Sequence, residues 1–457
     1  MARDPAGQGR NGVLRLLSLE LIFADERCAA ALSDASLLGA MARFEAALAR
    51  AGAANGFFAP AHAEVIVEAC KRASFDSAAL ARAARQAGTL AIPFVKALTD
   101  QVNAASPQAA RYVHFGATSQ DVIDTAVALC LKEAGARVAE LAGALGDALA
   151  ELAQRHGATP MLARTLLQPA APIPFGWKAA MWLAPLARAL PRFRAAAADA
   201  CVLQLGGASG TLSAFGERGG AMADALAGEL GLERRVTWHS ARDSFARFGA
   251  EAAVLAGLGA KIGRDVALLM QAEVGELGEP AAGGRGGSSS MPHKRNPALS
   301  MLALEAARRA PGLAGTLLNQ LDGEHERALG QWQSQWITLR ELTGAAASAL
   351  GAMLEVVRGL QVNEAAMRAN IERSKGLVFS EALALRTSRA VADRLCAQAL
   401  RDGRHLLEVL RADKEAMREL GAVDPAPLFE PQTSYGSAAE MTERVLSEWA
   451  RARENAP

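Results

Sequence analysis

The chain has 457 residues, 51% of them hydrophobic, and a formal net charge of +1. This length and apolar content allow large buried cores, and the near balance of charge argues against a nucleic-acid partner. The apolar stretch "VLRLLSLELIF" near the start is interrupted by Arg15 and Glu20 and is too short to cross a bilayer, so we expect no membrane partner. The five cysteines are far apart and form no C-x-x-C pair, which favours a cytoplasmic setting without disulfides or a metal site.

The first part of the chain, residues 1–110, is predicted to be an N-terminal helical domain preceded by a disordered tail. Its helical patterns are short and are separated by "GAANGFFAP" and "GTLAIPF", whose glycines and prolines interrupt helices. The whole chain is rich in alanine, leucine and arginine and poor in aromatic residues, a composition typical of helices rather than sheets.

Residues 111–357 are predicted to form a central domain of long helices. Proline is absent between Pro191 and Pro280 and between Pro311 and Pro425. In the first stretch, apolar residues recur at steps of three and four and predict one helix over about 244–279. In the second, a similar stripe comprises Trp332, Trp336, Leu339, Ala346, Leu350, Leu354 and Val357. Helices of this length must bury their stripes against other long helices, so a bundle is implied.

Residues 358–457 are predicted to be a C-terminal helical domain, which starts with the amphipathic segment "QVNEAAMRANIERSKGLVFSEALAL" and includes the turn-rich "VDPAPLFEPQTSYGS". The predicted fold class is therefore all-α, with three helical domains and a central long-helix bundle.

The segment "GGSSSMPHKRNP", residues 286–297, is predicted to be an irregular loop. Its glycines permit positive φ angles, and Pro292 and Pro297 prevent a regular helix. A glycine-serine run alone is typical of a solvated linker, but a linker has no need of the Met, Lys and Asn that follow. The spacing also differs from that of a phosphate-binding loop.

This loop contains "GSSSMPHKRNP", which resembles the signature G-S-S-x-M-P-x-K-x-N of the fumarase/aspartase superfamily. Two further segments resemble that superfamily's other signature regions, "VHFGATSQDVIDTA" at 113–126 and "ARTLLQPAAPIPFG" at 163–176. The flanking "MARFEAALARAG" and "EHERALGQWQSQW" extend the similarity over most of the chain. Within the superfamily, the sequence of these segments is most similar to that of the muconate cycloisomerases. The adenylosuccinate lyases are the next most similar group.

The resemblance implies a set of site residues. Ser288 would exchange the proton at carbon, Lys294 would stabilise the developing negative charge, and His114 would contact or orient the substrate. The residues implied to bind substrate carboxylates are Thr118, Ser119, Gln120, Thr165, Gln168, Asn296 and Arg327. The resemblance also implies a homotetramer whose active sites are shared between subunits, which would make the bundle a tetrameric core.

One departure from the superfamily separates the candidate reactions. Relatives that expel amines or hydroxide read Thr-His-x-Gln in the second region, whereas this chain reads Thr165-Leu166-Leu167-Gln168. Leucine cannot transfer a proton, and general acid catalysis contributes about 10²–10⁴ in rate when the leaving group is poor. A carboxylate leaves as an anion without protonation. The departure therefore favours a cofactor-free reaction in which a tricarboxylate of the muconate type closes to a lactone.

Two other functions remain open. A lyase that releases fumarate, such as adenylosuccinate lyase, would need another proton donor in place of Leu166. A catalytically inactive protein on the same scaffold, as some relatives of argininosuccinate lyase have become, is opposed by the intact Ser288 loop.

Several side chains have competing interpretations. Helical salt bridges explain His239 and Arg327 as well as substrate binding does. The segment "LGGASGTLSAFG", residues 205–216, is interpreted either as a turn or as a backbone contact to a ligand. Glu273, Glu276 and Glu279 are expected on a solvated helix face or at a contact with a partner subunit, rather than at a metal.

Overall fold

The computed structural model describes residues 21–281, 285–421 and 423–454. The chain divides into two compact units, each assembled from three separate segments. The described parts of unit 1 are residues 21–140, Arg192–Ala256 and Ala306–Ser348; those of unit 2 are Leu141–Pro191, residues 257–305 without the gap, and residues 349–454 without residue 422. The tail predicted before the first domain lies outside the described residues, and the predicted three-domain division stays a prediction.

The architecture is mainly helical with a few short strands, which confirms the predicted all-α class. The long helices contribute residues to both units; they are α8 (Ser119–Arg155), α9 (Phe175–Ala200), α11 (Asp243–Leu269), α12 (Ala298–Leu318) and α13 (Gln331–Arg358). Among the described residues, no helix combines the length and apolar character needed to cross a bilayer.

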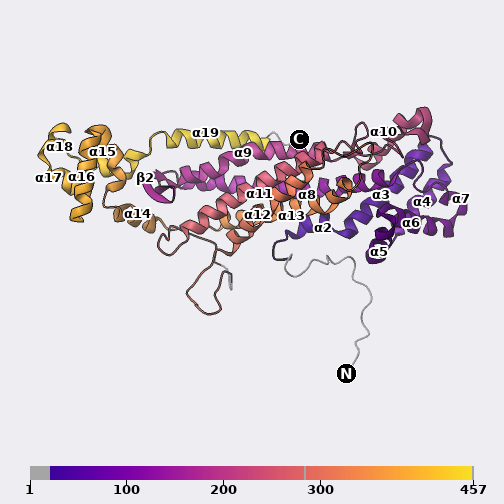
Figure 1. Ribbon diagram of the computed structural model, residues 1–457, viewed down its shortest axis with the longest axis horizontal. Helices are drawn as coiled ribbons and strands as arrows, with labels where there is room; N and C mark the ends of the chain where they lie inside the picture. The colour runs from indigo at the N-terminus through magenta and orange to yellow at the C-terminus, as the bar shows by residue number, and fades with distance from the viewer. Residues whose placement is uncertain (1–20, 282–284, 422, 455–457) are drawn as a thin grey trace, which may run out of the picture. The chain divides into compact units, whose positions relative to one another are not determined.

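Unit 1 adds shorter elements around the α8 start. They are α2 (Glu26–Ala31), α3 (Asp34–Ala54), α4 (Pro60–Arg72), α5 (Ser77–Ala87), α6 (Ala91–Ala105), α7 (Pro107–Ala110), β3 (Val202–Leu203), η1 (Ser213–Arg218), α10 (Gly219–Leu230) and β4 (Glu233–Arg234). Figure 1 shows α3 to α7 grouped together in this unit. Side-chain caps start several of these helices; the Asp76 carboxylate, for example, accepts the first N–H groups of α5. The largest core here is formed by α3, the start of α8 and α10.

Unit 2 contains a hairpin and the C-terminal helices. Its shorter elements are β1 (Pro160–Thr165), β2 (Gln168–Pro174), β5 (Leu277–Gly278), β6 (Gln361–Val362), α14 (Glu364–Arg373), η2 (Leu377–Phe379), α15 (Ser380–Arg386), α16 (Arg389–Asp402), α17 (Leu406–Ala412), α18 (Lys414–Glu419), η3 (Ala426–Phe429), η4 (Pro431–Ser434) and α19 (Ala438–Glu454). The antiparallel pair β1–β2 packs against α14, and α15 to α18 form a small cluster with its own apolar core (Figure 1).

Glycine allows close approach between the long helices. A Cβ added at Gly249 of α11 would lie 2.3 Å from Leu317 Cδ1 of α12, so the Leu317 side chain packs into the space that glycine leaves open. Further along α11, a Cβ added at Gly259 would lie 3.2 Å from Ala349 Cβ of α13, a close but less tight approach.

The long-helix predictions were partly right. The stripe from Trp332 to Val357 lies within α13, as predicted. The helix predicted over 244–279 ends at Leu269 instead, because the Glu276 N–H folds back to the Leu269 carbonyl and the chain then enters β5. The longest described helix, α8, was not foreseen. α9 continues through Pro185 and Pro191, which the sequence reasoning did not address.

Candidate active site

His114 lies in the irregular segment between α7 and α8, with a left-handed backbone at φ 58°. Its backbone N–H donates to Glu45 Oε2 at 3.0 Å, and its ring Nδ1 lies 2.6 Å from Glu45 Oε1. Burial of the ring opposes protonation, but the charges of Glu45 and Asp121 and the hydrogen bond to Glu45 outweigh it and raise the pKa of His114. The ring is therefore fixed from one side by a buried carboxylate.

Asp121, in the first turn of α8, fixes the segment that carries Thr118. Its fully buried carboxylate accepts the backbone N–H groups of Thr118, Gly206 and Gly207, each at 2.9 Å. The bond to Thr118, the residue before the helix, is the side-chain-to-N-cap half of a capping box. His239 Nε2 lies 2.8 Å from the same carboxylate and must carry a proton to donate to it. Three chain segments, residues 118–121, residues 206–207 and His239, thus meet at one side chain that the sequence did not single out.

The structure brings several predicted binding residues together in unit 1. Arg327, which precedes α13, donates from Nη1 to Thr118 Oγ1 at 2.8 Å and from Nε to Gln120 Oε1 at 3.4 Å. Gln120 is fully buried and also donates to the His239 carbonyl. Ser119 is half-buried at the start of α8. The Arg327 guanidinium and the Thr118 hydroxyl therefore lie together, close in sequence to His114. Gln120 makes a second contact to Arg327.

The helical salt bridges considered for His239 and Arg327 were wrong. Both residues lie outside helices, and both contact the first turn of α8 or the residue before it. The turn interpretation of "LGGASGTLSAFG" agrees with the use that Asp121 makes of the Gly206 and Gly207 amides.

The second signature region forms the β1–β2 hairpin in unit 2. Thr165 and Gln168 pair across a two-residue turn, and Leu166 and Leu167 occupy its apex at φ 51° and 67°. Two positive φ angles are typical of a type I′ turn, which normally uses Asn and Gly. Leu166 is 96% exposed and Leu167 is 72% exposed. The position where relatives read histidine is therefore a projecting apolar tip in this chain.

The hairpin is anchored through a buried ion pair. Arg164 binds the Glu276 carboxylate with two nitrogens, at 2.8 and 2.7 Å, and Asn370 of α14 donates to the same carboxylate at 2.7 Å. Glu279 accepts the N–H groups of Leu299 and Ser300 and so caps α12. The expectation that Glu276 and Glu279 face solvent or a partner was wrong, because both are buried and paired within unit 2; Glu273 alone is exposed.

The signature loop is irregular over its described residues, as predicted. The Ser288 Oγ accepts the backbone N–H of Met291 at 3.1 Å, and Asn296 donates from its backbone to the Gly286 carbonyl at 2.8 Å. Gly286 has φ 64°, and a Cβ there would lie 2.4 Å from the Asn296 carbonyl, so glycine is required. Lys294 is exposed. The backbone bond between Asn296 and Gly286 thus closes the base of the loop, while Lys294 is exposed to solvent.

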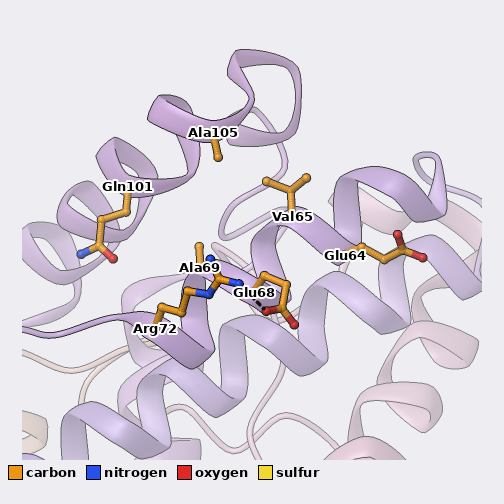
Figure 2. Close-up of a pocket in the computed structure, with 7 residues that line it drawn as sticks. All are labelled: Glu64, Val65, Glu68, Ala69, Arg72, Gln101 and Ala105. Carbon is orange, nitrogen blue, oxygen red and sulfur yellow. Dashed lines mark ion pairs between the residues drawn. The ribbon is translucent and has the colours of Figure 1, made fainter.

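A cavity in unit 1 is separate from these residues. The cavity has a volume of about 440 Å³ and is lined by residues of α4 and α6. Figure 2 shows these residues, with the Glu68–Arg72 ion pair among them. None of the predicted site residues lines it. Within the part of the chain that the structure describes, no cluster of three or more His, Cys, Asp or Glu side chains could hold a metal ion.

Comparison with known proteins places these features in a family. The family described as Lyase matches residues 24–312. This chain belongs to that lyase family. The 3-carboxy-cis,cis-muconate cycloisomerase of Bradyrhizobium diazoefficiens is 46% identical over 432 residues, which cover 92% of this chain and 96% of the relative. The nitrosuccinate lyase of Streptomyces davaonensis is 40% identical over 434 residues, 91% of each chain.

A solved structure supports the same placement. The 3-carboxy-cis,cis-muconate lactonizing enzyme from Pseudomonas putida superimposes with a TM-score of 0.89 at 37% identity, covering 95% of this chain and 99% of that chain. These similarities confirm the resemblance to the fumarase/aspartase superfamily that the three signature segments indicated.

Proposed function

We propose that this lyase-family chain is a 3-carboxy-cis,cis-muconate cycloisomerase, which closes its substrate to 4-carboxymuconolactone in protocatechuate catabolism. The observation that carries the proposal is the hairpin apex between Thr165 and Gln168, where two leucines replace the proton donor that relatives with poor leaving groups need. Relatives of that name match over more than nine tenths of the chain and support it.

The proposed reaction is an intramolecular addition. One substrate carboxylate attacks the conjugated double bond, charge moves onto the carboxylate at the far end, and Ser288 delivers a proton to carbon; a proton from solvent then restores the Ser288 hydroxyl. The product is an isomer of the substrate at the same oxidation level, so the chemistry consumes no cofactor.

The binding residues act on the three carboxylates. His114, Thr118, Ser119 and Arg327 would hold one end, with Gln120 acting through Arg327, and Thr165, Gln168 and Asn296 would hold the other. Lys294 would stabilise the charge that develops beside the reacting carbon. Ser288 is too weak an acid to lose its proton in water, so its alkoxide must be favoured by a cation and by the loop amides.

A second reaction also agrees with the leucines. Nitrite, like a carboxylate, leaves as the anion of an acid and needs no proton donor, and the nitrosuccinate lyase relative shares 40% identity. Adenylosuccinate lyase chemistry is disfavoured because its amine leaving group requires protonation.

We further propose a homotetramer with shared active sites, in the cytoplasm. Large apolar side chains are about half or more exposed in the single chain on each of α9, α11, α12 and α13; they are Met181, Val254, Met301 and Ile337. Such side chains on long helices favour burial against further copies of the chain. All five cysteines carry free thiols, which supports a reducing compartment.

The decisive experiment adds 3-carboxy-cis,cis-muconate to the purified protein and follows loss of its conjugated ultraviolet absorbance, with nitrosuccinate and adenylosuccinate assayed in parallel. Ser288→Ala should lower kcat by about 10²–10⁴-fold. Ser290→Ala, at the variable position of the same loop, is the matched control and should keep activity. Turnover of nitrosuccinate alone would replace the proposed function with the second one.

Shared sites have a separate test. Ser288→Ala and the Thr118→Ala/Ser119→Ala double variant should each be inactive, and mixing them should restore some activity by forming intact mixed sites. No recovery despite demonstrated subunit exchange would contradict sharing between subunits.

A further inference from the structure

Glu45, in the middle of α3, is a buried carboxylate that serves His114 alone among the hydrogen bonds described for it. Its side chain is 0% exposed, and its two oxygens accept the backbone N–H and face the Nδ1 of His114. An ionised carboxylate is costly to bury unless it is paired. Its neighbours Phe44 and Leu48 belong to the apolar core of unit 1. Apolar packing therefore does not explain why a carboxylate occupies this position.

The pairing determines what His114 can offer. Because Glu45 can only accept, the Nδ1 atom carries a proton, and Nε2 is the ring nitrogen that Glu45 does not engage. The side chain remains 17% exposed, so the ring is not sealed in the core. The left-handed backbone of His114 is uncommon for a residue with a side chain and persists only where the surroundings enforce it. Two bonds from one carboxylate enforce it here.

The charges around the ring are mainly negative. Glu45 approaches from α3 and Asp121 from α8, and both raise the pKa of His114 despite its burial. The Cys70 thiol of α4, which is close enough to Glu45 to feel its charge, stays neutral because burial raises its pKa to about 12. Arg50 of α3 also acts on Cys70, and Arg327 contacts the neighbouring Thr118. These charges shift the ring toward the imidazolium relative to a free histidine.

We propose that Glu45 is a positioning residue for substrate binding: it orients His114 so that Nε2–H serves as a cationic donor to a substrate carboxylate. The proposal rests on the proposed function for the identity of that carboxylate. It also assigns His114 a binding role, in which the ring faces Glu45 through Nδ1 and the substrate through Nε2–H.

The test replaces Glu45 by Gln and measures binding and turnover separately. Propane-1,2,3-tricarboxylate, a stable triacid, is titrated by calorimetry between pH 5.5 and 9, and KM and kcat are measured with the muconate over the same range. The His114 ring is followed by NMR in protein labelled with ¹³C-histidine. Its signal is identified as the one that disappears in His114→Gln. Glu229→Gln is the matched control. Glu229 of α10 pairs at the surface with Arg50, which lies on α3 as Glu45 does.

In the parent, the Kd for the triacid should rise up to about tenfold per pH unit above the pKa of His114. Glu45→Gln should lower that pKa, raise Kd and KM at neutral pH by about tenfold, and change kcat by less than about threefold. Glu229→Gln should match the parent. An unchanged His114 titration in Glu45→Gln, or a loss confined to kcat, would overturn the proposal.

Two outcomes remain informative if Glu45→Gln does not fold. In the parent alone, triacid binding that is independent of pH across the His114 titration would also overturn the proposal. A parent that binds the triacid with this pH dependence but does not cyclise the muconate would instead refute the proposed function and leave the Glu45–His114 assignment standing.

Discussion

Replacing Asp121 by Asn tests whether one carboxylate holds the Thr118 segment in place. Each Asp121 oxygen accepts two bonds, Oδ1 from Gly206 N–H and His239 Nε2, and Oδ2 from Thr118 N–H and Gly207 N–H. Asparagine has one acceptor oxygen and an NH₂ group. Whichever way the amide turns, a donor faces two donors, and two buried groups lose their acceptor.

The magnitude follows from that count. A buried donor left without an acceptor costs about 1–3 kcal/mol, so two of them imply a local loss of about 2–6 kcal/mol. Because about 1.4 kcal/mol corresponds to a factor of ten, the amides of Gly206 and Gly207 should exchange with solvent at least about 30-fold faster and up to about 20,000-fold faster. Hydrogen exchange with mass spectrometry on peptides spanning 204–210 and 113–121 measures this directly.

The matched control is Asp76→Asn. Asp76 accepts the N–H groups of Ala78 and Ala79 at the exposed start of α5, where Asn caps a helix about as well as Asp. Exchange near residue 76 should therefore barely change. If Asp121→Asn exchanged no faster than the parent at Gly206 and Gly207, the carboxylate would not be the anchor.

Three further predictions concern strain, reactivity and pH. Replacing Leu166-Leu167 by Asn-Gly should slow exchange in the β1–β2 hairpin, because a left-handed backbone costs about 1–2 kcal/mol per ordinary residue; faster exchange would contradict the assignment of strain there. Burial raises the pKa of four thiols to about 12, so at pH 8 they should react with a disulfide reagent orders of magnitude more slowly than after denaturation; they are Cys28, Cys70, Cys130 and Cys201. Because the pKa of His114 is raised, the stability that it adds is full below about pH 6.5 and is lost as pH rises through the raised value, at no more than about 1.4 kcal/mol per pH unit. Urea unfolding of the parent and His114→Gln between pH 6 and 9 should show their difference shrink; a constant difference would count against the charged ring.

Local patterns predicted what depends on local chemistry. The α13 stripe was visible because its apolar residues repeat with the helical period, and the irregular loop was visible because glycine and proline oppose helices over 286–297. The α11 boundary was not visible, since the turn after Leu269 is closed by a backbone bond from Glu276 that no side chain announces.

Pairings over long separations in sequence were not predictable. Glu45 and His114 are 69 positions apart, and Asp121 and His239 are 118 apart, so no spacing rule connects them. A buried acid in the middle of an otherwise apolar helix face, as in "MARFEAALARAG", was the one available signal for Glu45. The left-handed leucines gave none, because leucine is not a turn residue.

The interleaving of the two units has a consequence for synthesis on the ribosome. Unit 1 needs residues as late as Ser348, while unit 2 starts at Leu141 and needs the last helix. Neither can close when only its first segment has emerged, so the nascent chain must carry unburied apolar helices until most of it has been translated. We expect this polypeptide to depend on chaperones in the cell more than a chain of equal length whose units follow one another in order.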